Sequence, residues 1–189
     1  MKLQVITVQV DTREQRPLKF PENIQLINPQ TRSPRLCKVK TETVKLAAGD
    51  YRLKEYPNHA VVERKGSIRE LHTNLFTRDM GRQGRAFKKL AESCFCPYLL
   101  IEARPHDLLR VSQYNKNPDI LASRLFQVAY KYHLQLVWMQ RGSSVKTEIE
   151  MGRMIIHLLL GCPLQEEART VHAGPVNDTV GCDVGRTTA

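Results

Sequence analysis

The chain of 189 residues has no apolar run long enough to cross a membrane. Its longest apolar stretch near the C-terminus, from Met154 to Leu160, is interrupted by His157 and falls far short of the ~20 residues that a membrane helix requires. The N-terminal segment lacks the apolar core and the small-residue cleavage site of a secretory signal. We therefore expect a cytoplasmic protein without a membrane segment.

Cysteine and histidine are too few and too scattered to build a structural framework. The 5 cysteines are odd in number and irregularly spaced, which fits neither a disulfide framework nor a zinc site and points to a reducing compartment. The 6 histidines show no spacing typical of metal ligands. A phosphate-binding loop of the form G-x-x-x-x-G-K-[ST] is also missing, which argues against nucleotide hydrolysis.

Acidic side chains are scarce beside basic ones, 19 against 29, which gives a net charge of +10. The excess is confined to residues 1–161, with 27 basic and 15 acidic side chains, whereas residues 162–189 hold 2 and 4. A basic body favours a polyanion such as nucleic acid as partner, because binding to phosphates releases condensed counterions. A basic soluble protein with no such partner is the other interpretation of this charge.

Hydrophobic periodicity predicts one α/β domain. Alternating or β-rich segments predict strands over residues 3–10, 36–46, 59–64, 98–102 and 134–139. Helical signals, among them a capping box at Ser67 and a cap at Asn117, predict helices that begin near Ser67, Asp79, Asn117 and Ser144, the last of which ends at Gly161. Residues 16–35 are proline-rich and are expected to form a long loop. This order of elements predicts a mixed sheet with helices on both faces, in a domain of residues 1–161 followed by a disordered tail of residues 162–189.

A small set of charged residues lies at the end of the third predicted strand. Successive side chains on a strand point to opposite faces, so Glu63 and Lys65 project one way and Arg64 the other. With Asp50 they form the Asp…Glu-x-Lys pattern of many metal-dependent DNA-cleaving enzymes. Two acids can hold Mg²⁺, and the lysine can position an attacking water or stabilise charge on the scissile phosphate. On spacing alone, an exposed strand edge with a salt bridge explains the same residues.

Three motifs extend this pattern along the chain: Asp11-Thr12-Arg13-Glu14, Ala48-Gly49-Asp50-Tyr51 and Val62-Glu63-Arg64-Lys65. With Arg85-Ala86-Phe87 and the predicted strand that ends in Glu102, they resemble the nuclease domain of the XPF-type structure-specific endonucleases over about residues 5–160. The resemblance implies a restriction-endonuclease-like fold, in which helices flank a mixed central sheet. It implies that Asp11, Glu14, Asp50 and Glu63 bind Mg²⁺, for which Mn²⁺ can substitute, and that Asp50, Glu63 and Lys65 are catalytic.

One position departs from the motif of the resembled family. That family has an acid three residues beyond its Glu-Arg-Lys, where this chain has Arg69. Glu70 follows one place later, and two roles are open to it. It can support the metal, or it can be the N3 residue of a capping box that Ser67 opens. We favour capping.

Basic side chains recur at helical spacing on one face of the second predicted helix: Arg78, Arg82, Arg85 and Lys89. Another face of this helix holds Met80, Gly84, Phe87 and Ala91. We expect the basic face to contact a DNA backbone and the other face to pack on the sheet. An ordinary solvated face is the alternative. Arg64, on the far side of its strand, either serves the structure or contacts DNA from a flank.

Two later predicted helices, over residues 118–133 and 144–160, are apolar on two sides. Helices of this kind are buried on two sides. Either they pack against each other within the domain, or they form a homodimer interface, as in the resembled family.

The sequence therefore predicts a Mg²⁺-dependent DNA endonuclease that hydrolyses phosphodiester bonds, in DNA repair or recombination. The resembled family generally carries a tandem helix-hairpin-helix domain as well, for which this chain has no room. We therefore expect a compact version from bacterial or viral genome processing, whose preference for branched or flapped DNA is open. A catalytically silent DNA-binding or scaffolding module is the alternative, and the intact Asp50, Glu63 and Lys65 argue against it.

Overall fold

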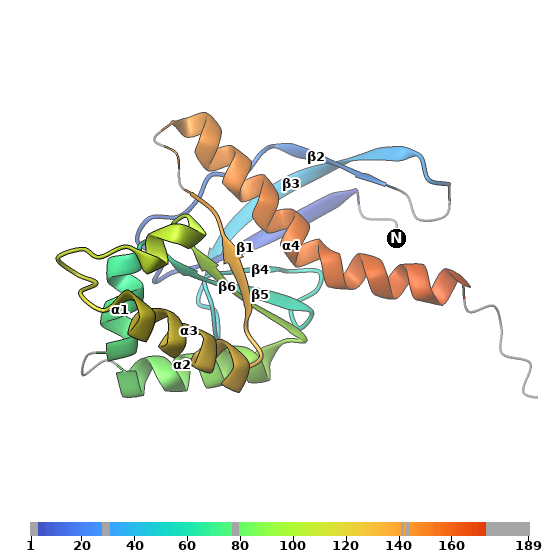
Figure 1. Ribbon diagram of the computed structural model, residues 1–189. Coiled ribbons are helices and arrows are strands. Elements are labelled where there is room, and N and C mark those ends of the chain that lie inside the picture. Colours follow the sequence, from blue (N-terminus) through green and yellow to red (C-terminus); the bar gives the residue numbers. More distant parts are fainter. Residues whose placement is uncertain (1–3, 28–30, 77–79, 141, 143, 173–189) are drawn as a thin grey trace, which may run out of the picture.

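The computed structural model describes residues 4–27, 31–76, 80–140, 142 and 144–172, with side chains through residue 165. The strands are β1 (Val5–Asp11), β2 (Asn23–Ile27), β3 (Pro34–Val44), β4 (Tyr51–Leu53), β5 (Ala60–Lys65), β6 (Cys96–Ile101) and β7 (Gln135–Trp138). They form one 7-stranded sheet in the order β2-β3-β1-β4-β5-β6-β7 (Figure 1). The pairs β1–β3, β5–β6 and β6–β7 are parallel and the others antiparallel, so the predicted mixed sheet is confirmed.

Helices cover both faces of this sheet. The described helices are α1 (Ile68–Phe76), α2 (Met80–Ser93), the short 3₁₀ helix η1 (Pro105–Leu109), α3 (Pro118–Lys131) and α4 (Val145–His172). Figure 1 shows α1, α2 and α3 grouped together and α4 crossing the sheet apart from them. None of these described helices combines the length and apolar composition that a bilayer span requires.

The core has one cluster on each face of the sheet. Val61 of β5 packs with α1, α2 and α3, whereas its neighbour Val62 packs with α4 and the strands β1 to β4. Adjacent strand residues point to opposite faces, so both faces of β5 are buried. The helices α3 and α4 contribute to different clusters. They therefore do not bury their apolar sides against each other, which was one of the two expected arrangements.

A turn at Gly49 brings the predicted catalytic residues to one edge of the sheet. Gly49 has a φ of +69°, and a Cβ there would lie 2.3 Å from Cγ1 of Val61, so only glycine fits. The next residue, Asp50, donates its N–H to the Val62 carbonyl (2.8 Å) and accepts the Asp11 N–H at its own carbonyl (2.9 Å). The Gly-Asp pair therefore ties β1 and β5 together just before β4.

The expected long loop over residues 16–35 is wrong in part, because β2 lies within it. Ile24 and Leu26 are buried, whereas the residues on either side of them are exposed. This alternation is typical of a strand with one buried face, and it pairs β2 with β3 at the edge of the sheet. The surrounding prolines obscured that signal in the sequence.

The last helix continues past its expected end. Gly161 is exposed on α4, with nothing within 4 Å of the position of a Cβ, and the helix extends through Pro163 to His172. The beginning of the expected disordered tail is therefore helical, and residues 173–189 lie outside the described residues. The division into a domain of residues 1–161 and a tail stays a prediction.

The packing face of α2 also differs from the expected one. Its buried residues are Gln83, Phe87 and Leu90, whereas Met80 is 47% exposed. Phe87 was expected on this face, but Gln83 was not, because a buried amide has no hydrophobic signature.

Candidate active site

A polar pocket of about 410 Å³ lies where β1, β5 and β6 end and β4 begins. Carboxylates line it from several elements: Glu14, Asp50, Glu63, Glu70 and Glu102. The cations of Arg13, Arg16, Arg64 and Lys65 line it as well. The sheet thus brings together most of the predicted site residues, although they lie far apart in the sequence.

Asp50 and Glu63 are the two acids that the Asp…Glu-x-Lys pattern singled out. One Asp50 oxygen (Oδ2) accepts the backbone N–H of Arg64 at 2.7 Å, and one Glu63 oxygen (Oε1) accepts from the Lys65 ammonium at 2.7 Å. Burial, and next the negative charge of Glu63, raise the pKa of Asp50 to about 7. A carboxylate whose charge is disfavoured in this way, with a second carboxylate beside it, forms a favourable place for a cation.

Among the described residues, no three His, Cys, Asp or Glu side chains form a group that could hold a metal ion by themselves. The carboxylate oxygens of the pocket fit Mg²⁺ better than zinc, because Mg²⁺ usually keeps several waters and binds through one or two carboxylates plus substrate phosphates. Asp50 and Glu63 are the pair that meets this requirement.

Lys65 is buried in the pocket rather than extended toward solvent. The residue is 4% exposed, and its ammonium lies 2.7 Å from Glu63 Oε1 and 3.8 Å from Glu70 Oε1. The same ammonium is 6.0 Å from the centre of the Phe87 ring. A charge held this firmly among carboxylates is suited to act at one fixed point.

Arg64 projects to the other side of β5, as predicted, and makes a buried ion cluster there. Its Nη1 lies 3.0 Å from Glu14 Oε1, and its Nε lies 2.6 Å from Glu102 Oε1. Its side chain is only 5% exposed, which favours the structural alternative over a contact with DNA. The expected DNA contact of Arg64 stays a prediction without support from this geometry.

Glu102 is a site residue to which the sequence assigned no role. β6 runs parallel to β5 with Ile101 opposite Lys65, so the residue after β6 falls beside the end of β5. The available signal was an acid at the end of a fully apolar strand, where a carboxylate requires a partner.

Asp11 does not line the pocket, although the resemblance implies a metal ligand at this position. Its Oδ1 accepts the backbone N–H and the Nε of Arg13, both at 2.7 Å. Its Oδ2 accepts the Leu46 N–H at 2.7 Å and Arg13 Nη2 at 3.0 Å. Burial alone would raise the pKa of Asp11, but these hydrogen bonds hold it below its usual value. Asp11 fixes the turn after β1, and its expected metal role stays a prediction.

Glu70 makes the contacts that capping requires. Its backbone N–H donates to Ser67 Oγ at 3.1 Å, and its Oε2 accepts the N–H of Gly66 at 2.9 Å. The carboxylate thus reaches one residue further back than in a standard capping box. Its side chain is 45% exposed, which favours a helix cap over a metal ligand.

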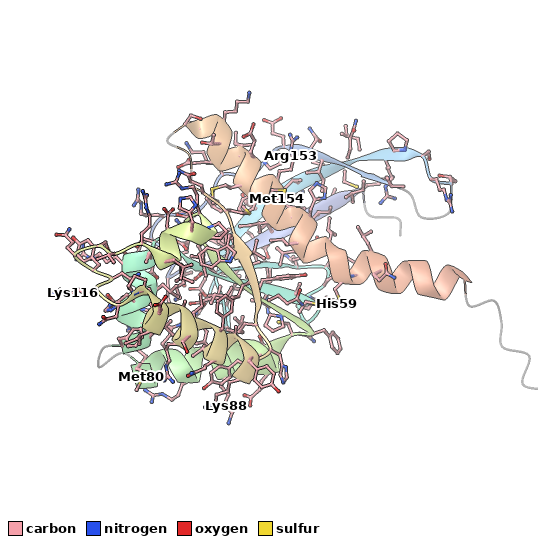
Figure 2. The ribbon with its side chains drawn as sticks, viewed as in Figure 1. His59, Met80, Lys88, Lys116, Arg153 and Met154 are labelled. Atoms are coloured by element: carbon pink, nitrogen blue, oxygen red, sulfur yellow. The ribbon has the colours of Figure 1, made fainter. Side chains whose placement is uncertain are left out.

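The basic face of α2 is described in part. Arg82, Arg85 and Lys89 are exposed on this helix, whereas Arg78 lies outside the described residues. Figure 2 shows two other residues of the helix, Met80 and Lys88, at its outer side. The exposed face of α2 is therefore positively charged.

Comparison with known proteins gives an independent indication of the family. Residues 10–144 match the ERCC4 domain family. No curated protein was found to match the chain. The fold is similar to that of XPF from Aeropyrum pernix, with a TM-score of 0.53 and 20% identity over 97% of this chain and 69% of that one. The same protein in complex with DNA gives a TM-score of 0.54 and 18% identity over 86% of this chain and 66% of that one.

These likenesses show the fold, which is the mixed α/β fold of the XPF nuclease domain. The chain spans about two thirds of the length of the two solved structures.

Proposed function

The chain belongs to the ERCC4 domain family, and on that premise we propose that it is a metal-dependent endonuclease that hydrolyses phosphodiester bonds in DNA. The family consists typically of metal-dependent endonucleases. The observation that carries the proposal is the pocket in which Asp50, Glu63 and Lys65 meet at the end of β5.

Asp50 and Glu63 would hold Mg²⁺, or Mn²⁺ in its place. Their fit to a hard divalent cation rests on the oxygen donors and on the raised pKa of Asp50, which reflects burial and next the negative charge of Glu63. Bound there, the cation supplies Lewis acidity and a bound water that is more easily deprotonated.

The remaining steps use groups of the chain itself. Lys65 would orient the attacking water or donate a hydrogen bond to a scissile phosphate oxygen, in a site where its charge is already fixed by Glu63. The ion cluster of Glu14, Arg64 and Glu102 would hold the end of β5, and so Glu63 and Lys65, in position. Fixed geometry of this kind contributes to catalysis by proximity.

DNA is the proposed partner, bound through its backbone by the basic face of α2. One of the two similar structures is a complex with DNA. Arg82, Arg85 and Lys89 are exposed and would contact phosphates, with Arg78 as a fourth contact.

DNA repair or recombination in the cytoplasm is the proposed context. Branched or flapped DNA is the candidate substrate, and a homodimer through α3 and α4 is the proposed assembly.

The decisive experiment is a cleavage panel. Labelled duplex, flap, fork and single-stranded DNAs are incubated with the protein in Mg²⁺, Mn²⁺ or EDTA. We expect cleavage of at least one DNA with either metal, none in EDTA, and none with Asp50→Asn. Asp119→Asn, an equal charge change at an exposed site on α3, is the matched control and should cleave normally.

Cleavage that persists undiminished in EDTA or in Asp50→Asn contradicts the proposal. Binding of DNA without cleavage under every metal condition would instead support the silent DNA-binding module.

A further inference from the structure

A second pocket lies among α1, α2 and α3, and it shares no lining residue with the candidate active site. Its volume is about 480 Å³, which is within the usual range for small-molecule sites. Leu75, Phe87, Val128 and Tyr132 contribute apolar and aromatic surface to it. The Phe87 ring, which lines this pocket, lies 6.0 Å from the ammonium of Lys65, which lines the candidate active site.

Two buried amide side chains line this pocket with unsatisfied atoms. Asn74 is 8% exposed and Gln83 is 7% exposed. Neither Oδ1 of Asn74 nor Nε2 of Gln83 has a hydrogen-bond partner among the described residues. Buried polar atoms without partners are rare and call for an explanation. The terminal torsion of an amide is soft, so a small rotation brings either atom to the pocket surface to meet a ligand.

Basic side chains surround the apolar part of the pocket. Arg85, Lys88, Arg124 and Lys131 line it, and among the described residues no aspartate or glutamate does. Lys88 also lies 3.7 Å from Glu92, outside the lining, and Arg124 Nη2 lies 3.3 Å from the Met80 sulfur. Figure 2 shows Met80 and Lys88 along the outer side of α2, where DNA would approach its basic face.

Apolar walls, an amide donor, an amide acceptor and surrounding cations are together complementary to a nucleotide. A base has planar apolar faces and an edge on which donors and acceptors lie side by side, and its phosphate is an anion. Proteins that hold a base out of the helical stack use aromatic or apolar side chains for its faces and hydrogen bonds for its edge. Every base offers both a donor and an acceptor on that edge, so Asn74 and Gln83 would accept any of them.

We propose that this pocket binds one unpaired nucleotide of the DNA substrate, beside the candidate active site. Its base lies against Tyr132 and Val128, its edge bonds to Asn74 and Gln83, and its flanking phosphates meet the surrounding cations. This inference rests on the proposed nuclease function and makes it more specific. The substrate class is DNA with an unpaired nucleotide near the cut.

Binding measured in EDTA tests the pocket without relying on catalysis. The full chain is titrated by fluorescence anisotropy with three duplexes: fully paired, with one bulged adenosine, and with a bulged abasic residue in the same place. The adenosine bulge should bind about tenfold more tightly than the abasic bulge, since contacts to one base contribute roughly this much. Equal affinity for the two bulges overturns the inference.

Gly84→Leu fills the pocket. A Cβ at Gly84 would lie 3.5 Å from the Tyr132 hydroxyl, an ordinary contact, and leucine favours a helix more than glycine does. We expect this variant to lose the tenfold preference and to keep its affinity for the paired duplex. Ala86→Leu, which adds the same side chain at an exposed position of α2, is the matched control and should keep both. Retention of the preference by Gly84→Leu overturns the inference.

Gln83→Met and Asn74→Leu distinguish a ligand role from a structural one. If the amide atoms lack partners in the free protein, these variants should melt no lower than the wild type and should still lose the preference for the adenosine bulge. A lower melting temperature with the preference intact would assign the amides to the fold and overturn the inference.

The two proposals fail separately. Metal-dependent cleavage without a preference for the adenosine bulge overturns the nucleotide pocket alone, whereas the preference without cleavage overturns the nuclease function alone. Free dAMP serves as a competitor. Binding of dAMP without any preference for bulged DNA overturns the assignment of the pocket to the DNA substrate.

Discussion

Burial and the charge of Glu63 raise the pKa of Asp50 to about 7 in the folded protein, whereas the unfolded chain has the usual value of 3.8. The folded state therefore binds the proton more strongly. The stabilising contribution of the Asp50 carboxyl group to the fold is complete below about pH 4 and is lost as the pH rises through about 7. At neutral pH and above, the ionised carboxylate that could hold a metal is consequently a cost to the fold.

Asp50→Asn should therefore stabilise the metal-free protein above pH 7. The amide carries no charge, so the gain in the free energy of unfolding is at most ~4 kcal/mol at pH 8 and shrinks toward pH 4. Melting temperatures in EDTA across this pH range measure it, with Asp119→Asn as the control. A gain that is the same at every pH, or a loss of stability, would contradict the prediction.

Lys65 is expected to act on the transition state more than on DNA affinity. Its ammonium is buried against Glu63, so a DNA backbone on the surface does not depend on it for binding. Lys65→Ala should lower the single-turnover rate by about 10²-fold or more, as loss of one transition-state donor does. Gel shifts should show a much smaller change in affinity. Equal losses in both measurements would make Lys65 a phosphate contact only.

A substitution at Glu70 distinguishes the role of a helix cap from that of a metal ligand. Its carboxylate bonds to the Gly66 N–H and its own N–H bonds to Ser67, and glutamine can make the same contacts. Glu70→Gln should therefore leave both the melting temperature and the cleavage rate nearly unchanged. A loss of activity beyond about tenfold that added Mg²⁺ restores would show that the carboxylate supports the metal.

At the scale of elements, local signals predicted what local forces determine. Ser67 and Glu70 mark the start of α1, and the alternation of Glu63, Arg64 and Lys65 predicts the faces of β5. β2 was missed because its stability depends on pairing with β3 and on burial of Ile24, neither of which a proline-rich segment reveals. The end of α4 was predicted too early because glycine usually marks a helix end. Gly161 instead lies on an exposed face of the helix, where the missing side chain removes no packing contact.

The basic face of α2 predicts a sequence-independent interaction with DNA. Replacement of Arg82 and Arg85 by alanine should weaken binding to every DNA sequence alike, because side chains that bind phosphates do not read bases. On duplex DNA the slope of log K against log[salt] should fall in magnitude by about 0.9 for each phosphate that is no longer neutralised. Titrations at several salt concentrations measure this slope.

Lys19→Ala and Lys116→Ala, single charge changes outside α2, are the controls for the slope. Lys19 lies 3.5 Å from Glu148, and Lys116 is exposed in the segment before α3. If a control reduces the slope as much per removed charge as the α2 variant does, the effect reflects net charge and not the helix face.

At the scale of the whole molecule, strand order decides which distant residues meet. Asp50, Glu63 and Lys65 could be predicted from their spacing and from the resemblance. The ion cluster of Arg64 with Glu102 could not, because it depends on the parallel register of β5 and β6. The second pocket arises from the packing of three helices around Phe87, and no local pattern encodes it.

α3 and α4 pack on opposite faces of the sheet, yet each exposes large apolar side chains: Phe126 (55%), Tyr130 (84%) and Met154 (52%). Phe126 and Tyr130 lie one turn apart on the outer side of α3, and adjacent exposed apolar residues of this size favour an interface. We expect the protein to form a homodimer that buries them.

Sedimentation velocity over a range of protein concentrations tests the dimer. The wild type should sediment as a dimer, and the double variant Phe126→Glu/Tyr130→Glu as a monomer with an unchanged circular dichroism spectrum. Val111→Glu, a similar change at a residue that is 76% exposed outside the helices, should remain dimeric. Its melting temperature should rise with concentration as that of the wild type does, because association stabilises the folded state by mass action. A wild type that stays monomeric at every concentration would show that these side chains do not mediate self-association, and the apolar surface of α3 would then require a different partner.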